Sequence, residues 1–423
     1  MDHMKFWSRE TNPETGERFE YVRSMLANGS NGKADLDAMV EGPYGVMLTE
    51  ALETQFRVEN DPFGPAFMAY FEGLGLKPEM HDDGDYYGRW ATYTPAEAFT
   101  EAGRGKKYPM VIYNIPLDMD IAQFEFRMGL EKPAGRDKFI IAYIQNTNWD
   151  NVSLMIDRMA EQCPVDRERV YITGFSYGGY QATAAYLRVP WKFAGCAPCG
   201  NDIWREWDNW RIPYTDDEVE TLRHLLVPFI QIVGECEASN FAPLNDYSPR
   251  THDQPIGTRR GKPGPKNPRA NPRLDPCVCP QRKLPDGTII NTPVSMMPRP
   301  AEGEDKHLWA LGHLNKRLYT LGCAPRDIDR CLSYLNTPED ELHHVLGFYA
   351  DREEIRYIGG HKHYIADIDN AGGMNTFRYV VWANGTHQTP VTMGELIWDF
   401  FRQFRRDTAP LITHRKSTSG TDT

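Results

Sequence analysis

The 423-residue sequence lacks the features that would mark a membrane-spanning, secreted or nucleic-acid-binding protein. It contains no apolar run close to the length of a membrane span. Its N-terminal residues lack the apolar segment of a signal peptide. Its net charge is -12, whereas binding to the phosphates of a nucleic acid needs a basic surface. We therefore expect a cytoplasmic protein that binds neither a membrane nor a nucleic acid.

Cysteine is scarce, with eight residues in the chain, which fits the cytoplasm, where thiols stay reduced. Cys196 and Cys199 lie in an apolar stretch that predicts a buried strand, in which cysteine packs as a small hydrophobic side chain. His361 and His363 alternate along a segment that predicts an exposed strand. Neither pair indicates a metal site, so the sequence predicts no metal ion.

The sequence also lacks an internal repeat, and from residue 87 onward it alternates predicted strands with predicted helices. Apolar and β-branched runs predict the strands, and apolar residues at helical spacing predict the helices. This alternation predicts an α/β protein with a mostly parallel central sheet flanked by helices. The strands are expected at Tyr87–Thr94, Tyr108–Ile115, Phe139–Ile144, Val170–Thr173, Phe193–Ala197 and Val227–Gly234, and the helices at Val152–Gln162 and Tyr180–Leu187.

The C-terminal part of the sequence predicts further elements of both kinds. Tyr357–Ala366 and Thr376–Trp382 predict strands that flank a glycine-containing turn. Met393–Arg406 predicts an amphipathic terminal helix, because its apolar residues recur on one face. His307–Leu318 and Ile328–Leu335 predict helices ahead of these strands.

Changes in composition suggest how the chain is divided. The segment between residues 240 and 300 is rich in proline, glycine, arginine and asparagine and poor in apolar residues. A lid or substrate-recognition loop and an irregular surface excursion both fit it, since insertions of this length are usually functional or disordered. The expected parts are an N-terminal extension that packs on the core (1–85), the core (86–239 and 340–410), an insertion or lid region (240–339) and a flexible tail (411–423).

The most informative stretch runs from Val170 to Gly179 and contains the pattern Gly-x-Ser-x-Gly around Ser176. A β-branched run precedes this pattern and a run of small residues follows it, which predicts a strand, a sharp turn and a helix. This order is the context of a nucleophile elbow, in which a strained turn lifts a serine hydroxyl clear of the sheet. Gly174 and Gly178 would let the strand and the helix pass closely. Ser176 is therefore the predicted nucleophile.

A serine nucleophile needs a base, and the base needs an acid that fixes its tautomer. On this kind of sheet the acid and the base follow the serine along the chain, in that order. His387 lies between the last predicted strand and the terminal helix and is the predicted base. The acid is expected just after the strand that ends at Gly234, where Glu237 is favoured and Glu235 is the alternative. Asp246 and Asp367 are less favoured than either.

Two backbone N–H groups are expected to stabilise the negative charge that develops on the substrate oxygen. Tyr177 directly follows the nucleophile and supplies the first predicted donor. Ile115 ends a predicted strand and supplies the second, since Pro116 has no N–H to donate. The His-Gly motif that lipases and esterases usually carry is absent from this loop.

These motifs resemble those of the α/β-hydrolase superfamily, and within it those of the polyhydroxybutyrate-depolymerase and feruloyl-esterase-like group. The resemblance implies an α/β-hydrolase fold and a serine esterase that needs no metal or organic cofactor. It also implies a small-molecule or oligomeric ester as the substrate. A glutamate stands where this superfamily usually has an aspartate. The segments that carry the likeness are Tyr93–Pro95, Lys107–Ile112, Val165–Gly179, Phe193–Gly200 and Ile397–Arg406.

Two other functions stay open on these motifs. A serine peptidase of the prolyl-oligopeptidase-like type carries a similar serine motif, although this chain shows no propeller repeat. A non-catalytic member of the fold would bind a ligand in the same place. A serine, a glutamate and a histidine in the expected chain order favour an esterase that forms an acyl-enzyme.

Overall fold

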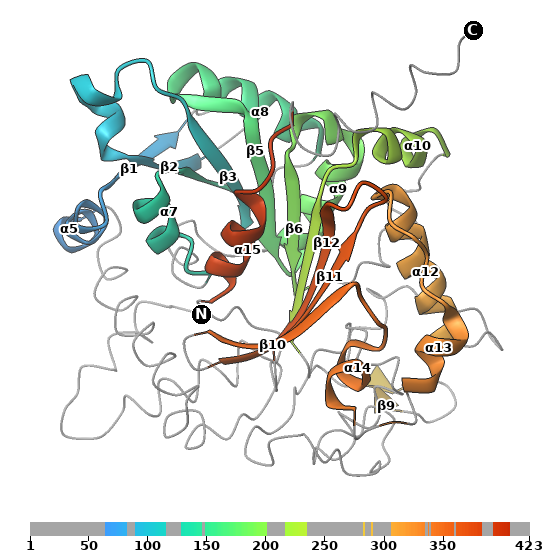
Figure 1. Cartoon of the computed structure of the whole chain (residues 1–423). Coiled ribbons are helices and arrows are strands. Elements are labelled where there is room, and N and C mark those ends of the chain that lie inside the picture. The colour runs from blue at the N-terminus through green and yellow to red at the C-terminus, as the bar shows by residue number, and fades with distance from the viewer. Residues whose placement is uncertain are drawn as a thin grey trace, which may run out of the picture.

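The apolar runs of the sequence form the central strands of one ten-stranded sheet, and helices cover both of its faces (Figure 1). None of the helices within the described ranges is long and apolar enough to cross a membrane. The computed structural model describes residues 64–82, 89–115, 128–145, 149–200, 216–234, 282–283, 289–290, 306–334, 337, 340–358, 361–382 and 392–406.

The strands of this sheet are β1 (Leu76–Asp82), β2 (Arg89–Pro95), β3 (Tyr108–Ile115), β4 (Ile140–Gln145), β5 (Val165–Phe175), β6 (Gly195–Cys199), β7 (Phe229–Gly234), β10 (Arg352–Ile358), β11 (His361–Asp369) and β12 (Asn375–Trp382). Their order across the sheet is β1-β2-β4-β3-β5-β6-β7-β12-β11-β10. The strands from β4 to β12 in this order pair in parallel. The remaining pairs, at the two ends of the sheet, are antiparallel. The short strands β8 (Arg282–Lys283) and β9 (Ile289–Ile290) form a separate ladder.

The middle of the sheet is buried on both faces, as its parallel strands require. Every residue of β3 is buried, and its sequence is almost continuously apolar. Successive side chains of β3 enter different clusters, with Met110 and Ile112 on one face and Val111 and Tyr113 on the other. The sheet therefore separates two hydrophobic cores.

Each core is closed by its own set of helices. The core that contains Met110 also contains apolar residues of α8 (Trp149–Gln162), α9 (Tyr177–Arg188), α10 (Asp216–Leu225), α12 (Lys306–Thr320), α13 (Ile328–Ser333) and α14 (Glu341–Leu346). The core that contains Val111 is covered by α5 (Pro65–Gly73), α7 (Glu131–Asp137) and α15 (Met393–Phe401). In Figure 1, α7 and α15 lie in front of the sheet and α8 and α9 lie behind it.

Most of the predicted strands are confirmed within a few residues, and β3 coincides with its predicted range. The predicted terminal helix is too long, because α15 ends at Phe401 and not at Arg406. The residues between the end of α15 and Arg406 are bound to β5 instead of continuing the helix. The hydroxyl of Tyr171 donates to the carbonyl of Phe404 at 2.6 Å, and the N–H of Arg406 donates to the carbonyl of Glu168 at 2.9 Å.

Parts of the expected N-terminal extension and of the expected insertion pack against the sheet, as the core does. Within residues 1–85, α5 packs on the sheet through Phe67 and Phe71, and β1 pairs with β2. Within residues 240–339, α12 places Leu314 and Leu318 in the same core as the central strands. Most of the N-terminal extension and most of the insertion lie outside the described residues.

Candidate active site

The chain turns sharply at Ser176, between the end of β5 and the start of α9. The backbone of Ser176 has φ 55° and ψ -117°, a conformation that residues with a side chain seldom adopt. The Ser176 N–H donates to the carbonyl of Cys199 at 2.9 Å, and the Ser176 carbonyl accepts from the N–H of Tyr180 at 3.0 Å. The neighbouring strand and the following helix thus hold a strained serine at the carboxyl end of β5.

The glycines around Ser176 are explained by close backbone contacts. A Cβ atom on Gly178 would lie 2.0 Å from the carbonyl oxygen of Asn114, and one on Gly174 would lie 2.4 Å from the backbone of Gly178. Neither position can hold a larger residue without moving β3, β5 or α9. The two glycines of the motif therefore serve the tight strand-to-helix turn for which the sequence predicted them.

The two residues predicted as oxyanion donors lie in segments that adjoin each other. Tyr177 is the first residue of α9, so its N–H has no acceptor within the helix. The N-terminus of a helix also carries a partial positive charge. Ile115 is the last residue of β3, and its carbonyl carbon lies 3.2 Å from the place that a Cβ of Gly178 would occupy. The end of β3 thus adjoins the first turn of α9, as an oxyanion site built from these residues would require.

The predicted base His387 and the predicted acids Glu235 and Glu237 lie outside the described residues. The strands that lead to them are described. Gly234 ends β7, Trp382 ends β12, and these two residues are partners in the parallel register of the sheet. Because β5 runs parallel to both strands, the segments predicted to carry the acid and the base begin at the same edge of the sheet as the turn at Ser176.

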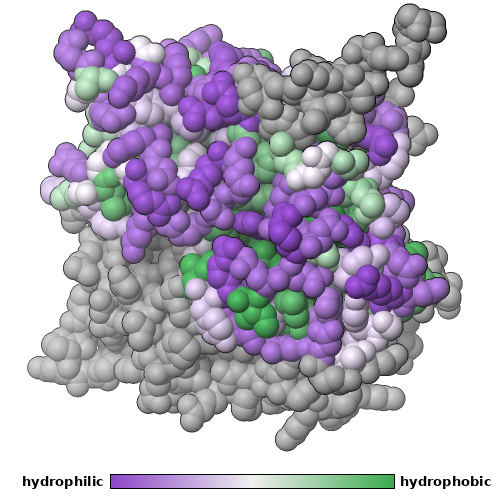
Figure 2. Space-filling view, viewed as in Figure 1, coloured by the Kyte–Doolittle hydropathy of each residue, from purple (hydrophilic) through white to green (hydrophobic). Residues whose placement is uncertain are grey.

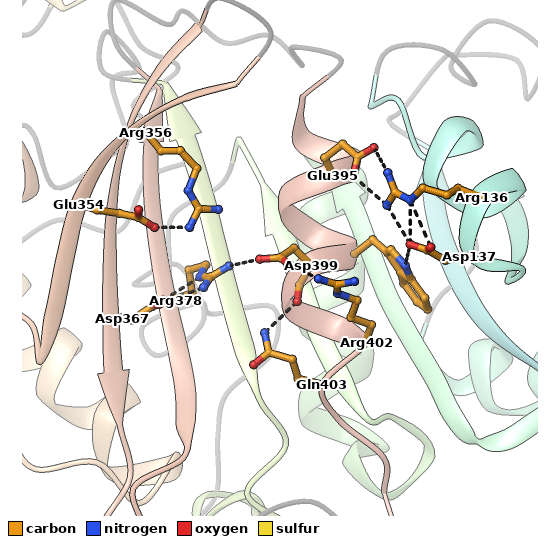
Figure 3. A network of polar contacts seen from close by, with 11 residues as sticks. Arg136, Asp137, Glu354, Arg356, Asp367, Arg378, Glu395, Asp399, Arg402 and Gln403 are labelled. Atoms are coloured by element: carbon orange, nitrogen blue, oxygen red, sulfur yellow. Dashed lines mark hydrogen bonds and ion pairs between the residues drawn. The ribbon is translucent and has the colours of Figure 1, made fainter.

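Asp367, the less favoured acid within the described residues, is already paired elsewhere. Its carboxylate accepts from Nε and Nη2 of Arg378 at 2.7 and 2.9 Å, and both side chains are buried. Arg378 lies well before the end of β12, opposite Ile230. Figure 3 shows the pair beside α15, with Asp399 on its other side. Asp367 therefore holds Arg378, which reaches Asp399 of α15, and lies away from the edge that carries Ser176.

The prediction of an exposed strand around His363 is wrong. His363 is fully buried in β11, opposite Trp382 in the antiparallel register with β12. Its Nε2 lies 3.3 Å from Oγ1 of Thr392, the residue that precedes α15. The sequence pattern missed this burial, because α15 arrives from a later part of the chain and covers that side of β11.

The prediction for Cys196 and Cys199 is confirmed, since both are buried in β6 and neither forms a disulfide. Burial raises the pKa of the Cys196 thiol well above its usual value. A thiol of this kind stays protonated and unreactive. Within the part of the chain that the structure describes, no cluster of histidine, cysteine, aspartate and glutamate has the arrangement of a metal site.

The chain has the α/β-hydrolase fold. A mostly parallel sheet with helices on both faces carries a strained serine on a strand-to-helix turn, where this fold places its nucleophile. Tyr177 and Ile115 adjoin that turn, and the two strand ends that lead to the acid and base segments share its edge.

Comparisons with known proteins found similarity in structure only. No family model and no curated protein matches this chain. FphF, a fluorophosphonate-binding serine hydrolase of Staphylococcus aureus, matches 38% of this chain and 81% of its own, with 14% identity and a TM-score of 0.32. An S-formylglutathione hydrolase from Agrobacterium tumefaciens matches 39% of this chain and 78% of its own, with 13% identity and a TM-score of 0.31. The feruloyl esterase module from Clostridium thermocellum matches 41% and 72%, with 12% identity and a TM-score of 0.31.

Proposed function

We propose that this protein is a serine hydrolase that cleaves carboxylic esters through an acyl-enzyme. The observation that carries the proposal is the conformation of Ser176, a non-glycine residue with φ 55° at the junction of β5 and α9. A strained conformation of this kind persists only where the surroundings impose it, and such residues cluster at active sites. The α/β-hydrolase fold hosts many reactions, so the residues around Ser176 must carry the functional conclusion.

The proposed reaction proceeds in two halves. The Ser176 hydroxyl oxygen attacks the ester carbonyl carbon while His387 takes the hydroxyl proton, and the N–H groups of Tyr177 and Ile115 stabilise the negative oxygen. The tetrahedral intermediate then expels the alcohol, which receives its proton from His387, and the acyl group stays on Ser176. Water attacks this acyl-enzyme with the same assistance and releases the carboxylic acid. Glu237, or alternatively Glu235, orients His387 throughout.

The proposal is tested by the hydrolysis of p-nitrophenyl acetate and of a longer-chain analogue. We expect turnover by the wild-type protein and its loss in Ser176→Ala. Ser153→Ala is the matched control, because Ser153 is a partly exposed serine of α8 and should leave turnover unchanged. A fluorophosphonate should label the wild-type protein and fail to label Ser176→Ala, since it reacts with the activated serine of such enzymes.

Other results would redirect the assignment. Equal turnover by the wild-type protein and Ser176→Ala would contradict the proposed nucleophile. Cleavage of a peptide amide at a rate comparable to that of the matching ester would indicate a peptidase, because an amide is intrinsically the less reactive substrate. A wild-type protein that neither turns over esters nor reacts with the fluorophosphonate would indicate a ligand-binding member of the fold.

The triad acid is identified by comparing two variants. Glu237→Gln should lower kcat by about a thousandfold, because the amide cannot stabilise the protonated base. Glu235→Gln should have an effect about tenfold or smaller, since its carboxylate would not contact His387. If the two effects are exchanged, Glu235 is the acid and the rest of the proposed mechanism stands.

A further inference from the structure

The outermost strand β10 presents an edge for pairing. It lies at one end of the sheet, and β11 is the only strand of the described residues with which it pairs. Its register with β11 runs without a shift from Arg352 opposite Asp367 to Ile358 opposite His361. A regular outer strand leaves a row of backbone N–H and C=O groups that another strand can use.

The two ends of the sheet differ in how they are protected. β1, at the opposite end, contains Lys77 and Pro78, which are residues that discourage pairing at an edge. β10 has the sequence REEIRYI and contains no lysine, proline or glycine. Tyr357 is 67% exposed and Ile355 is 41% exposed, both on the face that packs on α14. Figure 2 shows hydrophobic surface low on the visible face, in the region where Figure 1 places β10.

The charges of β10 fit a second copy of the same strand. Glu354 and Arg356 lie on the opposite face from Ile355, with side-chain exposures of 44% and 36%, and form an ion pair with each other. In an antiparallel pair centred on Ile355, Glu354 of each copy lies opposite Arg356 of the other. Cross-strand neighbours of opposite charge stabilise a sheet, and those of like charge destabilise it.

Neighbouring registers lack this complementarity. When the two-fold axis is normal to the sheet, each residue of one copy lies opposite a residue on the same face of the other copy. The axis must therefore pass beside a single residue of β10, and the alternative registers are those centred on other single residues. Centring the pair on Glu354 sets Glu354 against itself and Arg352 against Arg356. Centring it on Arg356 sets that arginine against itself. Only the register centred on Ile355 brings Glu354 and Arg356 together.

We propose that this protein forms a two-fold dimer in which β10 of one copy pairs antiparallel with β10 of a second copy, centred on Ile355. The sheet then continues from one chain into the other. The same patch serves both copies, so the assembly closes at two subunits and β10 ceases to be an edge in either of them. A contact made by one strand of each copy is smaller than the interface of a permanent complex, so the dimer dissociates on dilution.

The test is the mass of the full chain in solution, measured by sedimentation over loading concentrations from about 1 to 200 µM, the range in which small contacts associate. The wild-type protein should approach twice the monomer mass at the upper end. Glu354→Arg sets arginine opposite arginine and should weaken association about tenfold or more. The double variant Glu354→Arg with Arg356→Glu restores opposite charges and should dimerise like the wild-type protein.

A control variant separates this contact from a general effect of charge. Glu101→Arg breaks an ion pair with Arg104 whose side chains are 79% and 76% exposed and should leave association unchanged. A wild-type protein that stays monomeric over the whole range overturns the proposal, whatever else covers β10. A dimer that survives Glu354→Arg overturns it as well. Restoration in the double variant excludes misfolding as the cause of dissociation.

Discussion

The turn at Ser176 depends on residues that lack a side chain, and this dependence can be measured one residue at a time. The Cβ of an alanine at Gly178 would lie 2.0 Å from a carbonyl oxygen of β3, and backbone atoms cannot move away as a flexible side chain could. We expect Gly178→Ala to lower the free energy of unfolding by about 2 kcal/mol or more, measured by urea denaturation. Fluorophosphonate labelling of Ser176 should fall with it.

Gly312→Ala provides the matched control for this substitution. Gly312 lies within α12, and nothing lies within 4 Å of the place that a Cβ would occupy. Alanine in a helix is more favourable than glycine, so this variant should gain about 0.5–1 kcal/mol. A loss of stability at both positions would show that the contact with Asn114 is not the cause.

Glu131 makes the stability of the protein depend on pH. Its side chain is 4% exposed, and burial raises its pKa from 4.5 to about 7, although Tyr70 donates a hydrogen bond to it at 3.3 Å. Between these two pH values the folded protein holds a proton that the unfolded chain releases. The free energy of unfolding should therefore fall by about 3 kcal/mol as the pH rises from 4.5 to 7 and should then level off.

Urea denaturation at several pH values, with Glu131→Gln beside the wild-type protein, checks this dependence. The glutamine variant cannot ionise, so its curve should be flatter than that of the wild-type protein over the same window. Glu72→Gln, at an exposed residue of α5, should keep the wild-type dependence. Equal slopes for Glu131→Gln and the wild-type protein would contradict the assignment to Glu131.

At the scale of the elements, the segment that carries His387 is held at both ends by one residue. His363 pairs with Trp382, where β12 ends, and its ring contacts Thr392, the residue before α15. If His387 is the base, His363→Ala should lower kcat for ester hydrolysis by about tenfold to a hundredfold with little change in KM, because small displacements of a base are costly. Steady-state kinetics with p-nitrophenyl acetate measure both constants.

A double-mutant cycle separates positioning from a general loss of stability. His363→Ala and Thr392→Val remove the two partners of one contact, so their effects on kcat should be less than additive. His224→Ala, at an exposed position of α10, should leave both constants unchanged. Additive effects of the two substitutions would show that the contact with Thr392 does not position the base.

The elements differ in how well they can be predicted from their own residues. β3 is apolar along almost its whole length and was predicted without error, because a parallel strand is buried on both faces. β10 alternates charges with exposed apolar residues, so most of it was missed, and the strand predicted at Tyr357–Ala366 contains only its last two residues. Its extended conformation comes from pairing with β11. The turn at Ser176 was predictable because its glycines and its serine are neighbours in the sequence. The burial of His363 was not, since it depends on α15.

At the scale of the whole molecule, one face of the sheet is closed by a helix from late in the chain. α12 was expected in an insertion, yet Leu314 is fully buried with residues of β7 and α10. The guanidinium of Arg317, on the same helix, lies 4.3 Å from the ring centroid of Phe229 in β7. Packing of this kind makes α12 part of the core, so that residues 306–334 should unfold together with the central strands.

The substitution Leu314→Ala tests whether α12 unfolds together with the central strands. Removing a fully buried leucine leaves a cavity, and we expect the free energy of unfolding to fall by about 2–5 kcal/mol. Leu308→Ala on the same helix is the control, because Leu308 is 45% exposed and should cost about 0.5 kcal/mol or less. If α12 belonged to a lid that moves apart from the sheet, Leu314→Ala would produce a separate early transition and leave the main one in place. A single transition that shifts as a whole, seen alike by circular dichroism and by loss of Ser176 labelling, would show that the helix and the strands that carry the site fold as one unit.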